Sequence, residues 1–456
     1  MVSAWSRILA LQTRSLQGKR TLLLETASDR LQPAVVSRLI WRLMPFLFLL
    51  YIVAYLDRIN VSFGVLQMRS QLGLSDLVYG RAAGIFFAGY FFFQLPSNLI
   101  LEKVGVRRWI SGLMVLWGVI SCLMIFIRGP LSFYSMRFLL GAAEAGFFPG
   151  MILYMKRWFP AQSRGRAVAW FMTANPIAGI VGSPISGALL NLHGAGFAGW
   201  QWMFLMEGLP AIVLGAIVFL ILPDTPREAT WLKDDERTWL LEKLERERQE
   251  EARVPQGNFW RVLVSPRIWM LSLVYFGVST TMYGVTLWLP TVIRALSGLS
   301  YFWTGAVAVL PFLVTVIVMV WVGMRSDRTG ERRWHTAVPA FAAGASLVVA
   351  GYGTSTIVVV TAIGLGLAFA ESMVGPFWAM ATSRLEGLSA AAAIAVINSL
   401  ANLGGYFGPD IIGLFRTANG GFRGGLLAIA ATVALSGATA LVVGRNTPPK
   451  AVIRPA

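Results

Sequence analysis

The sequence predicts an all-α membrane protein with twelve transmembrane helices arranged as two six-helix bundles. Hydrophobic residues make up 56% of the 456 residues and charged residues 13%, and the mean hydropathy is +0.64. The chain is therefore far more apolar than a soluble domain. Apolar runs of about 19–28 residues recur along it, each long enough to cross roughly 30 Å of hydrocarbon as a helix.

In chain order, residues 1–42 are basic and lack the long apolar core and cleavage site of a signal peptide, so we expect a cytoplasmic leader. An N-terminal bundle is expected at 43–223 and a C-terminal bundle at 267–444. The hydrophilic segment 224–266 between them has leucines at helical spacing, which predicts a cytoplasmic linker with a surface helix. Residues 445–456 form a cytoplasmic tail. The twelve spans are expected near 43–64, 79–101, 109–127, 132–154, 165–191, 201–223, 267–292, 302–324, 335–353, 357–381, 389–415 and 423–444.

The distribution of basic residues fixes the expected orientation. With the N-terminus inside, most of the 39 Lys and Arg residues fall on cytoplasmic segments, as the positive-inside rule requires of a cell (inner) membrane protein with both termini cytoplasmic. The net charge of +17 then anchors the protein to the inner leaflet and does not indicate nucleic-acid binding. The exceptions are outer residues Arg69, Arg81, Arg128, Arg294, Arg416 and Arg423 and the span residues Arg58 and Arg137.

Motifs for catalysis or metal binding are missing from the sequence. Cys122 is the single cysteine, and His193 and His335 have no metal-ligand spacing. Neither HExxH nor GxxxxGK[ST] occurs, so a zinc protease and an ATP-driven pump find no support. We expect no enzyme activity, no cofactor and no metal, and a monomer in the lipid bilayer.

Residues 50–64, LYIVAYLDRINVSFG, place Asp57 and Arg58 inside an apolar run. Charges near a bilayer centre are costly, so they usually face the protein interior or a water-filled path. Neighbouring helical residues point about 100° apart, so these two cannot pair on one face. We hypothesise that Arg58 contacts the carboxylate of a transported anion as a lone guanidinium and that Asp57 carries a proton. A purely structural interhelical pair is the alternative.

Further acids lie inside the spans. Glu144 lies two helical turns after Arg137 on nearly the same face. Burial pushes a carboxylate toward its neutral form and a nearby cation pushes it back, which suits a group that loads and releases protons. Glu144 is therefore a candidate proton carrier, with pairing to Arg137 as the alternative, and Arg137 is expected to be structural. For Glu371 and Glu207, packing is preferred over a role in transport.

The two halves resemble each other. EKVGVRRW at 102–109 and DRTGERRW at 327–334 share the glycine, both arginines and the tryptophan in register. NPIAGIVGSPISG at 175–187 and NLGGYFGPDIIG at 402–413 share three glycines in register. A duplicated six-span unit follows, and transporters built from repeats place their site near the midplane between the halves.

These motifs resemble those of the major facilitator superfamily over nearly all of the chain from about residue 40. The loop motif G-x-x-x-D-R-x-G-x-R-R is complete in the second half, whereas Asn98, Glu102 and Lys103 replace its leading residues in the first half, which keeps Arg107. YLDRINVSF, AEAGFFPG, GWQWMFLMEGLP and AVINSLANLGGYFGP resemble the anion:cation symporter family, particularly its bacterial tartrate, phthalate and hydroxyphenylacetate permease-like branch. The second-half motif consists of Gly323, Asp327, Arg328, Gly330, Arg332 and Arg333.

The resemblance implies two bundles related by a pseudo-two-fold axis and proton-driven uptake of an organic anion by alternating access. Asp57 and Glu144 would carry protons, and Arg58 would bind the substrate. The loop-motif residues and Arg137 would serve structure and gating. Two aromatic residues beside Pro376 or Gly284 are also expected at the site. The expected substrate contacts besides Arg58 are Tyr55, Tyr90, Asn175, Tyr283, Trp378, Asn398 and Asn402.

We therefore predict a secondary active transporter that imports a tartrate-like hydroxy acid, a sugar acid or an aromatic carboxylate together with protons. An anion exchanger or exporter on the same fold is one alternative. A membrane sensor that binds without transporting is another.

Overall fold

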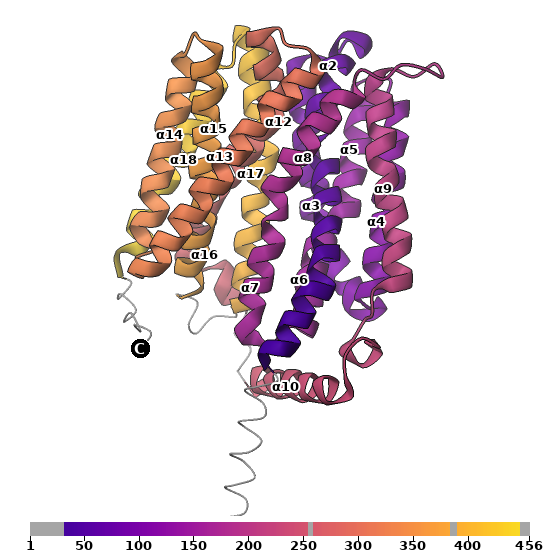
Figure 1. The fold of residues 1–456 in the computed structure, drawn as a ribbon. Coiled ribbons are helices and arrows are strands. Elements are labelled where there is room, and N and C mark those ends of the chain that lie inside the picture. Colours follow the sequence, from indigo (N-terminus) through magenta and orange to yellow (C-terminus); the bar gives the residue numbers. More distant parts are fainter. Residues whose placement is uncertain (1–31, 254–258, 384–389, 447–456) are drawn as a thin grey trace, which may run out of the picture. The chain divides into compact units, whose positions relative to one another are not determined.

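The computed structural model describes residues 32–253, 259–383 and 390–446, and these ranges are almost entirely helical (Figure 1). Most of the expected leader and tail lie outside the described residues. After a helical stretch Gln32–Leu72, whose last part is α2 (Val61–Leu72), the first half contains α3 (Asp76–Val104), α4 (Val106–Leu123), α5 (Pro130–Glu144), α6 (Phe147–Trp158), α7 (Ala161–Met172), α8 (Ala174–Leu189) and α9 (Gly199–Ile221). There follow α10 (Asp234–Arg253), α11 (Phe259–Leu263), α12 (Pro266–Ser297), α13 (Tyr301–Thr329), α14 (Arg333–Tyr352), α15 (Thr356–Ser372), α16 (Val374–Thr382), α17 (Ala390–Asn419) and α18 (Arg423–Val443).

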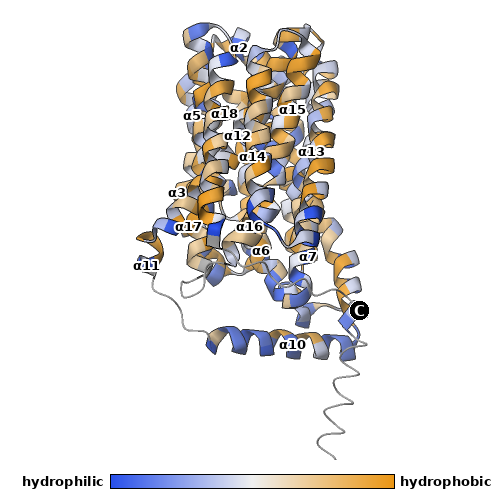
Figure 2. Cartoon of the chain, turned by 90° about the vertical axis from the view of Figure 1, so that its left-hand side faces the viewer, coloured by the Kyte–Doolittle hydropathy of each residue, from blue (hydrophilic) through white to orange (hydrophobic). Residues whose placement is uncertain are grey.

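Helices of membrane-spanning length and composition dominate the described ranges. Eleven helical stretches there are long and apolar enough to cross a bilayer. The thirty-residue α17 is not among them; it carries the polar residues Asn398, Asn402 and Asp410. With α17 the set has twelve members, and the predicted all-helical fold class is confirmed. Figure 2 shows the contrast between these apolar helices and the polar α10.

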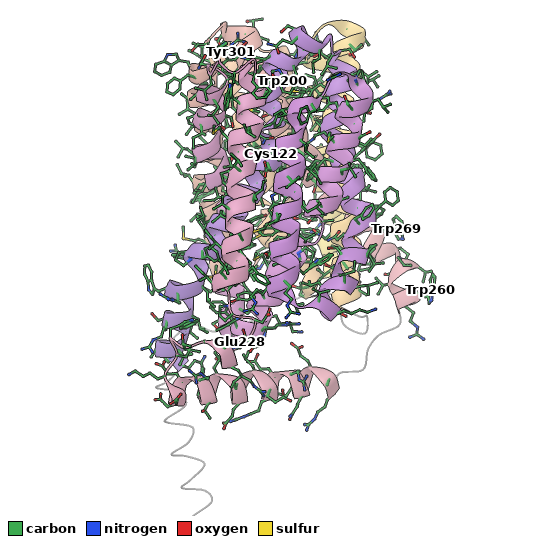
Figure 3. All side chains as sticks on the ribbon, turned by 90° about the vertical axis from the view of Figure 1, so that its right-hand side faces the viewer. Cys122, Trp200, Glu228, Trp260, Trp269 and Tyr301 are labelled. Atoms are coloured by element: carbon green, nitrogen blue, oxygen red, sulfur yellow. The ribbon has the colours of Figure 1, made fainter. Side chains whose placement is uncertain are left out.

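Exposed side chains on the spans are largely apolar. Trp269 on α12 is 52% exposed, and Trp260 on the short α11 just before this span is 70% exposed; Figure 3 shows both projecting from the helices that carry them. Large exposed apolar surface on a soluble protein would promote association. On membrane-spanning helices it is the surface that contacts lipid, with tryptophans favoured toward the interfaces.

The duplication in the sequence is repeated in the way the helices begin and end. Gly73 and Gly298 both end a helix in the left-handed region, with φ of 62° and 65°. Ser75 and Ser300 both cap the next helix, each accepting a hydrogen bond from the backbone N–H three residues later. Glycine and serine are favoured at such positions because glycine tolerates positive φ and a serine hydroxyl satisfies a free N–H. The two halves therefore share local structure as well as sequence.

The described residues form two compact units, which do not coincide with the two halves. The described residues of the first are 32–49, 151–172 and 222–253. Within it, α10 contributes Glu236, which accepts a hydrogen bond from Arg38 at 2.6 Å, and Glu247, which accepts from the backbone N–H of Ala161 at 2.9 Å. Ala161 is the first residue of α7, where a carboxylate satisfies free N–H groups and complements the helix dipole. The helix expected in the 224–266 linker is therefore present as α10.

The described residues of the second unit are 50–150, 173–221, 259–383 and 390–446, which include the repeated motifs. Within it, α3 packs against α17 and α8 against α13, so the two halves of the sequence are in contact. Glycines allow this approach: a Cβ on Gly187 would lie 2.5 Å from the carbonyl oxygen of Tyr301, and one on Gly413 2.7 Å from that of Asp76. The shared glycines were expected where backbones approach closely, and these two lie at such contacts. The predicted bundle boundaries remain a prediction.

Candidate functional site

Helices of the spans are interrupted beside the predicted polar residues. The first span has a turn at Asn60, shortly after Asp57 and Arg58, and α5 ends at Glu144. The α15 helix likewise ends one residue after Glu371. Within a membrane, backbone that leaves the regular hydrogen-bond pattern is tolerated only where protein or a cavity surrounds it. The side chains of Asp57, Glu144 and Glu371 are buried, so they lie in the interior of the protein.

Arg58 is the centre of a buried polar cluster in the second unit. Its Nη2 lies 2.9 Å from Glu144 Oε2, and its Nη1 donates to the hydroxyl of Tyr283 at 3.3 Å. The Arg58 side chain is 12% exposed and that of Glu144 1%. The expectation that Arg58 is a lone guanidinium is wrong, because the carboxylate of Glu144 pairs with it. The partner of Glu144 is Arg58, in place of the Arg137 that was considered as its alternative partner.

The contact between Arg58 and Tyr283 joins the two halves of the sequence. These residues are 225 positions apart, as are the helix-ending glycines Gly73 and Gly298. Arg58 and Tyr283 therefore occupy equivalent positions in the two repeats. A contact between equivalent positions lies on the pseudo-two-fold axis, and repeat-built transporters bind their substrates near that axis.

Aromatic rings surround the two arginines. The Arg58 guanidinium carbon lies 5.2 Å from the ring centre of Phe86 and 5.3 Å from that of Tyr90. Arg137 approaches the same Phe86 ring at 4.9 Å, and its Nε donates to the carbonyl of Ala82 at 3.4 Å. Such rings attract a cation through their electron-rich faces, more strongly where water is excluded. Phe86 thus separates two like charges while stabilising both.

Asp57 lies in a separate environment of neutral donors. Its Oδ1 accepts from the hydroxyl of Ser121 at 2.7 Å and from the amide of Asn60 at 3.4 Å, and its side chain is fully buried. Its Oδ2 has no hydrogen-bond partner among the described residues. Asp57 and the neighbouring Arg58 therefore point to different partners, as expected for adjacent residues on a helix.

The other predicted substrate contacts divide into two groups. Tyr55 is buried, and its hydroxyl has no hydrogen-bond partner in the described part of the chain; the same holds for Oδ1 of Asn175. Half-buried Trp378 packs edge-on against Tyr275, with 5.3 Å between ring centres, beside the core of the second half. Half-buried Asn398 and Asn402 lie one turn apart on α17.

The loop-motif residues lie near the end of α13. Asp327 binds Arg332 at 2.6 Å, Arg328 is exposed, and Gly330 ends α13 with φ of 66°. A Cβ on Gly323 would meet nothing within 4 Å, so this glycine serves no close packing in the present conformation.

The corresponding loop residues of the first half have other surroundings. Glu102 is exposed, and Arg107 approaches the ring of Phe219 at 6.0 Å.

At the start of α14, Glu331 accepts a hydrogen bond from the backbone N–H of Trp334 at 2.8 Å. Partial burial raises the pKa of Glu331, whereas this hydrogen bond and those from His335 lower it. The hydrogen bonds together outweigh burial, so the pKa of Glu331 lies below its ordinary value.

Two contributors to the site escaped the sequence analysis. Phe86 lies one helical turn before Tyr90, so helical spacing from a suspected site residue could have indicated it. Ser121 has no comparable signal, since a single hydroxyl in an apolar run usually bonds its own helix. Its pairing with Asp57 depends on the packing of α4 against the first span.

A helical membrane protein with two sequence-related halves and a buried ion pair on the axis between them has the architecture of a secondary transporter. Residues 47–409 match the model of the Major Facilitator Superfamily. The chain belongs to this superfamily, whose members are membrane transporters, and it is a transporter and not an enzyme.

Relatives and solved structures are consistent with this assignment. A protein of Agrobacterium vitis, whose name gives tartrate as a provisional substrate, is 44% identical over 92% of this chain and 94% of its own length. A "Quinolone resistance transporter" of Acinetobacter baumannii is 38% identical over 86% of this chain and 91% of its own. A bacterial homologue of the human lysosomal transporter Spinster has a TM-score of 0.73 at 16% identity, covering 89% of this chain and 96% of that chain. This last similarity shows the fold alone.

Proposed function

We propose that the protein is a proton-coupled symporter that imports a small organic carboxylate across the inner membrane by alternating access, with both termini in the cytoplasm. The observation that carries this proposal is the pairing of Arg58 with Glu144 on the axis between the halves. A guanidinium binds a carboxylate well, often through two parallel hydrogen bonds. A substrate carboxylate that binds Arg58 must therefore compete with Glu144.

Competition for one guanidinium couples the substrate to a proton. If an anion entered while Glu144 stayed ionised, the buried cluster would hold two carboxylates and one cation, and an uncompensated buried charge is costly. Protonation of Glu144 releases Arg58 and removes that charge. The cluster then holds one cation and one anion both with and without substrate, so each substrate carboxylate enters with one proton.

Asp57 is proposed as a second proton carrier. It is buried among neutral donors, Ser121 and Asn60, and a carboxylate in such a setting is stabilised by a cation less directly than Glu144 is by Arg58. Its unpartnered Oδ2 leaves room for a proton. Protons on both acids would be needed for the loaded transporter to change its facing, because alternating access requires a difference in the affinities of the two states.

Tartrate-like hydroxy acids are the first substrates to test, since a relative 44% identical over most of the chain is named for tartrate. Hydroxyls of such an acid would find donors and acceptors in Tyr283 and in the unpartnered groups of Tyr55 and Asn175. Sugar acids and aromatic carboxylates stay in the test panel.

Export is a second candidate function, favoured by one specific observation. The Acinetobacter baumannii relative is named for quinolone resistance. A quinolone carries a carboxylate, so Arg58 would suit either direction of transport.

Proteoliposomes with an imposed proton gradient test the proposal. We expect accumulation of one class of acid in wild type, and its loss in Glu144→Gln, which keeps side-chain shape but cannot ionise. Counterflow of labelled against unlabelled substrate needs no net proton movement, so Glu144→Gln should retain it. Glu207→Gln is the matched control, because Glu207 is also a buried acid but bonds Ser186 at 2.6 Å, away from Arg58.

Undiminished accumulation in Glu144→Gln would contradict the proposal. Efflux without accumulation in wild type would favour the exporter.

A further inference from the structure

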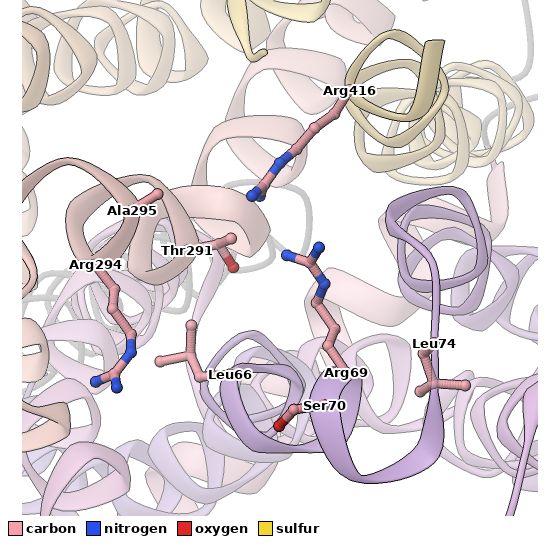
Figure 4. Close-up of a pocket in the computed structure, with 8 residues that line it drawn as sticks. All are labelled: Leu66, Arg69, Ser70, Leu74, Thr291, Arg294, Ala295 and Arg416. Atoms are coloured by element: carbon pink, nitrogen blue, oxygen red, sulfur yellow. The ribbon is translucent and has the colours of Figure 1, made fainter. Parts of the chain in front are cut away.

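A second group of arginines surrounds a cavity at one end of the second unit. The cavity has a volume of about 490 Å³ and lies at the end of the spans that we expect to be extracellular, near the turn after α2 (Figure 4). Residues from both halves of the sequence line it: Arg69 and Ser70 from α2, Thr291 and Arg294 from α12, and Arg416 from α17. It is distinct from the Arg58 cluster, with which it shares no lining residue.

Arg69 and Arg416 point toward each other across this cavity in Figure 4. Both bind Asp76: Arg69 Nη1 lies 2.9 Å and Arg416 Nε 3.2 Å from its carboxylate oxygens. Arg294 lies at the side, where its Nη1 donates to the carbonyl of Leu299 at 3.1 Å and its guanidinium covers the ring of Tyr301. Two guanidinium groups thus share one carboxylate, and a third arginine lines the same cavity, so the cavity has an excess of positive charge.

Polar groups that face the cavity are unsatisfied. Thr291 is 4% exposed, and its hydroxyl has no hydrogen-bond partner among the described residues. Arg416 Nη1 is buried and equally without a partner in the described ranges. Figure 4 draws the Thr291 side chain to one side of the two facing arginines. A buried polar group without a partner costs about 1–3 kcal/mol, so each of these donors gains from a ligand.

We propose that this cavity is a second anion site, which binds a small oxyanion, a carboxylate or an inorganic one such as sulfate, between Arg69, Arg416 and the Thr291 hydroxyl. Oxyanions suit the planar donor pattern of guanidinium groups. An anion here adds to a surplus of cations, so it requires no proton and displaces no acid. The site is therefore chemically distinct from the centre.

Binding at this site also affects conformation. Arg69 belongs to the first half, whereas Thr291 and Arg416 belong to the second, so one anion bridges both. The donors face each other only while this end of the second unit is closed, as it is here, with Tyr79 donating to the carbonyl of Leu287 from the other half. A ligand favours the state that it binds more tightly. The anion therefore stabilises the closed arrangement of this end.

Site-specific cysteine labelling tests the proposal without any measurement of transport. The chain has one cysteine, so Cys122→Ala gives a cysteine-free protein in which Ser70→Cys reports on the cavity. We expect sodium sulfate and sodium tartrate, at ionic strength held constant with sodium chloride, to slow modification by N-ethylmaleimide at least about five-fold and saturably. Arg128→Cys, on an exposed loop residue, should show no protection.

Two matched variants link protection to the proposed donors. Thr291→Val keeps the shape and removes the hydroxyl, and it should raise the half-protecting anion concentration about ten-fold. Thr286→Val removes another buried, unpartnered hydroxyl from the same helix but outside the cavity, and it should have no effect. Thr291→Ser keeps the hydroxyl, so its half-protecting anion concentration should stay close to that of the protein with Thr291.

Protection by tartrate and not by sulfate would identify the organic anion as the ligand, and protection by both a general oxyanion site. No protection by either anion would overturn the proposal. Protection that is unchanged in Thr291→Val would also overturn it, because the anion would then act from elsewhere.

Discussion

The central cluster and the cavity near α2 both use arginine, but with opposite balances of charge. In the centre, Arg58 faces Glu144 one to one, in a pair that is almost completely buried. Near α2, Arg69 and Arg416 share Asp76, Arg294 also lines the cavity, and the Arg69 side chain is 32% exposed. An anion that enters the centre must replace an acid, so it depends on a proton. An anion that enters the other cavity only reduces an excess of cations.

The comparison shows why one residue type serves two purposes in the same fold. Burial raises the free energy of each unpaired charge. An anion can therefore bind at the central pair only if the net charge of the cluster stays the same. Water and neighbouring cations screen the charges near α2, so an anion can bind or leave there without a compensating step. Coupling to protons therefore depends on burial and on the one-to-one pairing, and not on arginine itself.

The largest expected difference comes from the same substitution in the two regions. Arg58→Ala leaves Glu144 buried without its partner and should lower the free energy of unfolding by about 3–5 kcal/mol. Arg69→Ala, in a partly exposed pair, should lower it by about 0–1 kcal/mol. Chemical denaturation of both variants in detergent would compare them.

A double variant serves as the control for the Arg58 effect. Arg58→Ala combined with Glu144→Gln should recover part of the lost stability, since no charge is then left unpaired. Equal effects of Arg58→Ala and Arg69→Ala would remove the distinction between the regions.

A second prediction concerns the packing that closes the cavity end. A Cβ on Gly84 would lie 2.5 Å from the carbonyl oxygen of Tyr406 in the other half. Gly84→Ala should cost the closed arrangement about 1–3 kcal/mol through overpacking and raise the labelling rate of Ser70→Cys. Gly323→Ala is the matched control, because a Cβ there meets nothing. A labelling rate that is the same in both variants would show that this contact does not close the cavity.

A third and smaller effect is expected at Asp76. Asp76→Asn removes the carboxylate that partly neutralises Arg69 and Arg416. The excess of cations grows, so the half-protecting sulfate concentration should fall a few-fold in the labelling assay. Asp410→Asn alters another acid paired across the halves, with Arg81 at 3.4 Å, outside the residues that line the cavity. Weaker sulfate protection in Asp76→Asn than in wild type would mean that Asp76 positions the arginines more than it competes with the anion.

Sequence patterns predicted much of this molecule because membranes impose strong rules on composition. Span lengths, the duplicated halves and the importance of Arg58 and Glu144 all follow from the cost of polar groups in hydrocarbon. The pairing of Arg58 with Glu144 did not follow from the sequence. These residues are 86 positions apart, and their contact depends on how the two helices that carry them are rotated against each other. Trp378 was expected at the site on the evidence of a nearby proline; it is half-buried against the core of the second half, and its contact with substrate stays a prediction.

Outer arginines were equally visible in the sequence, but only as exceptions to the positive-inside rule. Arg69, Arg294 and Arg416 lie on three separate helices, and no spacing links them. Tertiary packing alone brings them to one cavity and directs an unpartnered threonine toward it.

The central claim is that a substrate carboxylate takes the place of ionised Glu144 on Arg58, and proton uptake on binding tests it most directly. Titration calorimetry of the purified protein with the transported acid, in buffers of different ionisation enthalpy, gives the number of protons taken up per ligand. At a pH where Glu144 is ionised in the free protein, the account predicts about one proton in wild type and about none in Glu144→Gln. Binding to wild type without proton uptake, or equal uptake in the variant, would contradict it.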